Sequence, residues 1–77
     1  MSADTYNEVA LRAGKAGLVD ATQYTGTDYN AFLQDVSGDL GIAVEDLKTI
    51  IETDKDAFAE HVTAMTKANA QILAIAE

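Results

Sequence analysis

Residues 54–77 read DKDAFAEHVTAMTKANAQILAIAE, and this stretch decides the fold. It contains no glycine and no proline, the two residues that interrupt a helix most strongly. Its apolar residues recur at spacings of three and four, which is typical of an amphipathic helix. Thr53 and Asp56 have the spacing of a capping box at its start. The sequence therefore predicts one helix over residues 54–76, about 34 Å long.

Two neighbouring seams of mostly apolar residues run along this segment. The first consists of Phe58, Val62, Met65, Asn69, Ile72 and Ala76. The second consists of Ala57, His61, Ala64, Ala68, Gln71 and Ile75. Ile72, Leu73 and Ile75 widen the apolar arc to about 160°, more than a surface helix with one buried face needs. The second seam permits close approach either by another chain or by the first helix of the same chain.

Three shorter helices are predicted upstream, over residues 4–17, 28–37 and 44–52. The clearest is the second, in which Tyr29, Phe32, Leu33 and Val36 follow the helical spacing. We expect Thr27 or Asp28 to cap it and Gly38 to end it. Residues 20–27 are expected to form a loop. The predicted fold is all-α, a single domain over residues 1–77 with three short helices and one long C-terminal helix.

The first predicted helix contains two glycines near its end, Gly14 and Gly17. Each weakens a helix interior by about 1 kcal/mol. Either the helix ends there, or the small residues let another helix come close. The capping spacing of Thr5 and Glu8 marks its start, although Ser2 or Asp4 would serve equally well.

The charge of the chain excludes several kinds of partner. Its 77 residues include 13 acidic and 5 basic side chains, which gives a formal net charge of -8. This charge repels nucleic-acid phosphates and anionic lipid surfaces, so neither is expected to bind directly. No apolar run is long enough to cross a membrane. The N-terminus lacks the pattern of a signal peptide, and we expect the chain in the cytoplasm or within a virus particle.

Residues 18–54 carry most of this charge, with eight acidic residues against a single base, Lys48. A helix-turn-helix over residues 36–51 would place Glu45 and Asp46 at the start of its recognition helix, which opposes DNA binding. We expect four of these carboxylates to form an exposed acidic surface: Asp35, Asp39, Glu45 and Asp46. A solubilising face, a docking surface for a basic partner and a cation site remain alternatives.

Little in the sequence supports catalysis or cofactor binding. The chain has no cysteine and one histidine, His61, which we expect to be hydrogen-bonded at the boundary of an interface. Ser37 lacks the Asp-Ser-Leu context of an acyl carrier's phosphopantetheine site. The fragments of calcium-loop pattern at residues 35–39 and 54–56 are incomplete. No catalytic, cofactor-binding or metal-binding residue is therefore predicted.

These observations predict a non-catalytic structural or interaction subunit, such as a component of a virus particle or a filament. The chain would assemble with copies of itself or with a larger protein through its long C-terminal helix. The predicted interface residues are Phe58, His61, Val62, Met65, Asn69, Ile72, Leu73 and Ile75. Asn69 is polar within an apolar seam, and such residues often fix the register of packed helices. The alternative is an acidic inhibitor or decoy that occupies the basic, nucleic-acid-binding surface of a partner.

Overall fold

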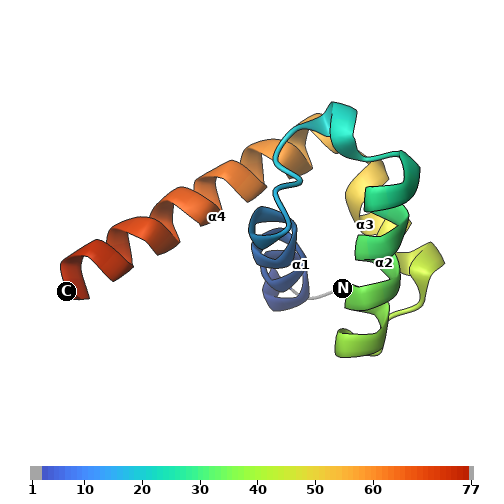
Figure 1. The fold of residues 1–77 in the computed structure, drawn as a ribbon, viewed down its shortest axis with the longest axis horizontal. Coiled ribbons are helices and arrows are strands. Elements are labelled where there is room, and N and C mark those ends of the chain that lie inside the picture. The colour runs from blue at the N-terminus through green and yellow to red at the C-terminus, as the bar shows by residue number, and fades with distance from the viewer. Residues whose placement is uncertain (1–2, 77) are drawn as a thin grey trace.

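The computed structural model describes the backbone of residues 3–76 and the side chains of residues 3–68. Its elements in chain order are α1 (Ala3–Lys15), η1 (Ala21–Gln23, a 3-10 helix), α2 (Gly26–Leu40), α3 (Val44–Glu52) and α4 (Lys55–Ala76). No strand occurs between residues 3 and 76, so the predicted all-α class is confirmed. In Figure 1 the C-terminal end of α4 extends to the left, away from the other helices.

One hydrophobic core joins the four α-helices, and Ala21 of η1 packs against it partly buried. It consists of the buried side chains Val9, Ala10, Ala13, Leu18, Tyr24, Tyr29, Phe32, Leu33, Val36, Leu47, Ile51, Phe58 and Val62. Phe58 lies at its centre and contacts Tyr6 and Tyr24 edge-on, with ring centroids 5.5 and 5.7 Å apart. Such edge-to-face pairs are favourable because the positive edge of one ring meets the negative face of the other. Phe58 therefore links α4 to α1 and to the segment after η1.

Helix α1 packs closely against α4 because of Gly14. A Cβ atom at this position would overlap Oγ1 of Thr66 on α4, so a small residue is needed where the two helices meet. This confirms the close-approach alternative for Gly14. The helix itself ends at Lys15, before the predicted end at Gly17. The N–H groups of Gly17 and Leu18 bond to carbonyls of Gly14 and Ala13, at 3.1 and 2.9 Å, which is the pattern of a Schellman motif.

Helix α2 is longer at both ends than predicted. It continues through Gly38 and ends at Leu40. Its C-cap is Gly41, whose φ of 68° lies in the left-handed region that glycine adopts readily. The N–H of Gly41 bonds to the carbonyl of Ser37 at 2.9 Å, which satisfies the end of the helix. Its N-cap is Thr25, which makes no side-chain capping bond. The predicted cap at Thr27 or Asp28 was therefore wrong.

Two further predictions are corrected by the structure, one for the loop over residues 20–27 and one for the start of α4. The expected loop over residues 20–27 contains η1, because Asp20 and Gln23 form a reciprocal capping box. Helix α3 has the predicted bounds, and Thr53 is its C-terminal cap. The predicted capping box of Thr53 and Asp56 at the start of α4 was wrong. Asp54, the residue directly before the helix, occupies the N-cap position, and its Oδ1 accepts the N–H of Ala57 at 3.1 Å.

Candidate interaction site

The inward face of α4 belongs to the core of the chain itself. Of the predicted interface residues, Phe58 and Val62 have no exposed surface. Met65 is half-buried and packs against the same core. Phe58 and Val62 are therefore occupied within one chain and offer a partner no surface.

His61 lies at the boundary between α4 and α1. Its Nε2 atom is 2.7 Å from Oδ1 of Asn7, and its ring centroid is 4.9 Å from that of Tyr6. In the tautomer that carries a proton on Nε2, this N–H donates to the amide oxygen. The half-buried ring thus contacts α1 on one side.

The alanines of the second seam are not covered by α1. Ala57, Ala64 and Ala68 are all exposed, and we call these three residues the alanine strip. Their spacings of seven and four place them on one side of α4, next to His61. Of the two predicted alternatives for the second seam, contact with the first helix of the same chain is therefore found for His61, whereas α1 leaves the alanine strip uncovered. A flat strip of small side chains is left on the surface of the single chain.

Four predicted interface residues have no described side chain. Asn69, Ile72, Leu73 and Ile75 lie in the helical backbone of α4 but outside residues 3–68, whose side chains the structure describes. Their roles stay predictions from the sequence.

The four predicted acidic-surface residues are all exposed. Asp35, Glu45 and Asp46 are on the surface of α2 and α3. Asp39, in contrast, has a basic partner: its Oδ2 atom is 2.6 Å from Nη1 of Arg12. The acidic surface is therefore not uniform, since one of its members holds α2 to α1.

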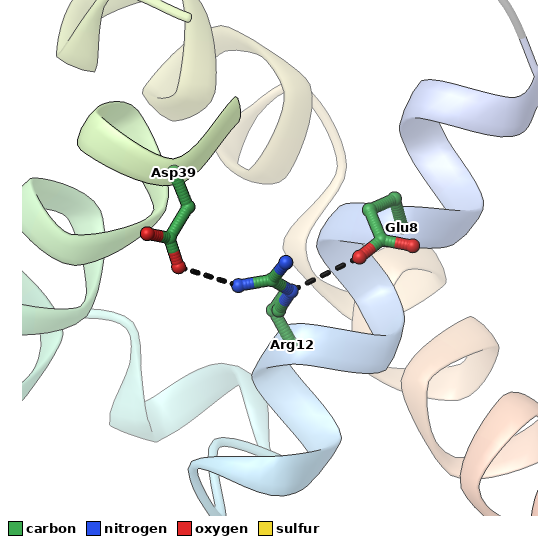
Figure 2. A network of polar contacts seen from close by, with 3 residues as sticks. All are labelled: Glu8, Arg12 and Asp39. Carbon is green, nitrogen blue, oxygen red and sulfur yellow. Dashed lines mark hydrogen bonds and ion pairs between the residues drawn. The ribbon is translucent and has the colours of Figure 1, made fainter. Parts of the chain in front are cut away.

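Arg12 is the centre of a small ion-pair network, shown in Figure 2. Its Nε donates to Glu8, one turn earlier on α1, at 3.0 Å, and its Nη1 donates to Oδ2 of Asp39 at 2.6 Å. Hydrogen bonds to Glu8 and then to Asp39 raise the pKa of Arg12 above its ordinary value. The spacing of Glu8 and Arg12 on one helix is a signal the sequence offers. The pair with Asp39 spans 27 residues and depends on how the helices pack.

Two buried tyrosines make their polar contacts inside the chain. The hydroxyl of Tyr24 donates to the carbonyl of Leu18 at 3.1 Å. The hydroxyl of Tyr29 donates to Glu52 at 2.8 Å. Burial raises the pKa of Tyr24 to about 12, and burial together with the Glu52 bond raises the pKa of Tyr29. Both hydroxyls thus hold the fold together as neutral donors.

Within residues 3–68, no three His, Cys, Asp or Glu side chains are grouped so as to hold a metal ion. Among the described residues, no helix is both long and apolar enough to cross a membrane. No protein-family model, curated protein or solved structure matches this chain. Its function is therefore inferred from its own surfaces.

Proposed function

We propose that this chain is a non-catalytic structural or interaction subunit that assembles through α4. In this proposal the inward face of α4 completes the core with the three shorter helices, and its exposed side carries the contact. The partner is a further copy of the chain or a larger protein, as in a virus particle or a filament. The supporting observation is the alanine strip, Ala57, Ala64 and Ala68, which stays exposed on a helix whose Phe58 and Val62 side chains are fully buried in the core.

The sequence extends this strip with larger apolar residues. Ile72 and Ile75 follow Ala68 at spacings of four and seven, which continues the same side of a helix. Alanine lets two helix axes approach to the short end of the usual 8–10 Å range, at about 8 Å. Burying each isoleucine is worth about 1.5–3 kcal/mol. Small residues followed by two isoleucines thus form a surface suited to another helix.

The test is the solution mass of the chain by light scattering, with helix content followed by circular dichroism. Ile72→Asp with Ile75→Asp should reduce the assembly to a monomer, because both charges enter the proposed contact. Ala70→Asp with Ala74→Asp is the matched control, since it adds the same charges to the opposite side of the same segment. Equal masses for the two double variants, or a monomeric wild-type chain, would contradict assembly through this side of α4.

A second candidate is the acidic decoy, supported by the exposure of Asp35, Glu45 and Asp46. Such a protein would occupy the basic, nucleic-acid-binding surface of a partner, and its binding would weaken steeply with salt. The two functions are separated by variants. Asp35→Asn with Glu45→Gln should impair a decoy and leave assembly through α4 unchanged.

A further inference from the structure

A groove of about 690 Å³ lies between α1 and the corner that joins α2 to α3. Its lining residues are Asp4, Thr5, Glu8, Leu40, Ile42, Asp46, Thr49 and Ile50. None of them belongs to α4. Leu40, Ile42 and Ile50 form its apolar part, and each is half-buried because it packs against the core from one side only. Three large side chains therefore leave part of their apolar surface open in one depression.

The groove continues along α3. A second hollow of about 310 Å³ shares Thr49 and Ile50 with it and runs on to Tyr6, Thr53 and Asp54. Together the two hollows follow most of α3, which has 9 residues and is thus about 13 Å long. We call the groove and the second hollow together the trough. Its length matches roughly two turns of a partner helix.

The charged residues that line the trough are all acidic. Asp4 and Glu8 lie on the α1 side, and Asp46 lies on the α3 side. Asp54 stands at the far end of the second hollow. No lining residue of either hollow is basic, and the guanidinium of Arg12 is already engaged by Glu8 and Asp39. Because Glu8 is already paired with Arg12, an occupant with apolar anchors would meet the negative charge of Asp4 on the α1 side and of Asp46 and Asp54 on the α3 side.

We propose that this trough binds an amphipathic helix of a partner protein, with leucine or isoleucine on one face and lysine or arginine beside it. Apolar anchors spaced by three and four residues suit a groove of this kind, and the basic flanks suit its border. The C-terminal segment of a second copy is a poorer match, because residues 69–77 contain no base and end in Glu77. The proposal is independent of assembly through α4, whose residues do not line the trough.

The test uses an 18-residue helical peptide of leucine and lysine, with the leucines on one face. Two comparison peptides replace lysine by glutamate or scramble the order so that no apolar face forms. Binding to the full chain is measured by calorimetry, and the contact is located by amide chemical shifts. We expect the leucine–lysine peptide to bind and to shift residues of α3 and of the first turns of α1. Neither comparison peptide should bind comparably.

Two charge reversals on adjacent residues give a matched pair. Asp46→Lys, on the border of the trough, should weaken binding about fivefold, because an attraction becomes a repulsion. Glu45→Lys changes the net charge equally but lies outside the lining, and should have a smaller effect. Ile42→Ser should also weaken binding by removing an apolar anchor site, with circular dichroism confirming that the helices remain.

Three results would overturn the proposal. The first is equal weakening by Asp46→Lys and Glu45→Lys, which would show general charge attraction. The second is shifts confined to α4, and the third is no binding of the leucine–lysine peptide. Light scattering of Asp46→Lys tests the two proposals separately. Because Asp46 lies outside α4, the solution mass of this variant should equal that of the unaltered chain, whether or not the peptide binds to the trough.

Discussion

Replacing Phe58 with leucine tests whether this ring belongs to the core of one chain or to a contact between chains. The structure gives Phe58 no exposed surface and places it edge-on to Tyr6 and Tyr24, at 5.5 and 5.7 Å. Leucine keeps an apolar side chain in the site but cannot make either ring contact. The variant therefore removes two defined interactions without opening the large cavity that alanine would leave.

The expected loss follows from these two contacts. An edge-to-face pair is worth about 0.5–1.5 kcal/mol beyond its buried area, so the change should cost about 1–3 kcal/mol. A chain of 77 residues has a total stability of about 4–12 kcal/mol at 0.05–0.15 kcal/mol per residue. Phe58→Leu should thus remain folded, whereas Phe58→Ala, at about 3–5 kcal/mol, approaches the whole stability of the chain.

The assay is urea unfolding followed by circular dichroism at two protein concentrations tenfold apart. With a slope near 1 kcal/mol per molar urea, the midpoint should fall by about 1–3 M, and equally at both concentrations. Glu60→Gln, exposed on the same helix, is the control and should stay within about 0.5 kcal/mol of the unaltered chain. An unchanged midpoint together with a lower solution mass would refute the placement of Phe58 in the core.

Three further predictions concern the packing, titration and charge of the described residues. Gly14→Ala should raise the free energy of unfolding by about 1 kcal/mol, through helix propensity, in a Thr66→Ala background. Beside native Thr66 the gain should be roughly zero, because Oγ1 of Thr66 must move aside. A double-mutant cycle measures this difference, and additive effects would contradict it. The pKa of Tyr24 in the folded chain, about 12, exceeds the ordinary value near 10. The contribution of Tyr24 to the free energy of unfolding should therefore be fully present below pH 10 and be lost as the pH rises from about 10 to 12. Tyr24→Phe should make the free energy of unfolding fall less over this pH range in urea titrations. Asp39→Asn should lower the melting temperature at low salt, because Arg12 loses a partner, whereas Asp35→Asn should not; about 0.5 M salt should remove the difference.

The positions of the core residues were largely predictable from helical spacing. Tyr29, Phe32, Leu33 and Val36 recur at the period of a helix, and all four are buried. Spacing determines which side of a helix is apolar, and burying that side of α2 in the core removes its apolar surface from water. The bounds of α3 were predicted for the same reason.

Helix ends and polar contacts were predicted less well, for two different reasons. Gly38 was the predicted stop, but α2 continues to Leu40, which packs partly buried against the core, and Gly41 is its C-cap. The capping box of Asp20 and Gln23 was present in the sequence as an Asp-x-x-Gln spacing. The surrounding residues favour a loop, and this spacing alone does not distinguish a short 3-10 helix from one.

The candidate sites depend on how the helices pack, which spacing alone does not determine. The pairing of Arg12 with Asp39 joins helices that are distant in sequence. The trough exists because α1 stands opposite the α2–α3 corner, so its acidic and apolar residues come from three helices. From the sequence, Asp46 was predicted to belong to an exposed acidic surface, but its place beside Ile42 and Ile50 depends on the packing of the helices.

The contact between α1 and α4 also affects the order in which the chain completes its fold. His61 and Asn7 are 54 positions apart in the chain, and Tyr6 of α1 meets Phe58 of α4. Contacts between such distant segments slow folding, because a long loop must close before they contribute any stability. During synthesis α1 is made before its principal partner, α4. The apolar face of α1, with Val9, Ala10 and Ala13, thus remains without that partner until α2, α3 and α4 have been synthesised.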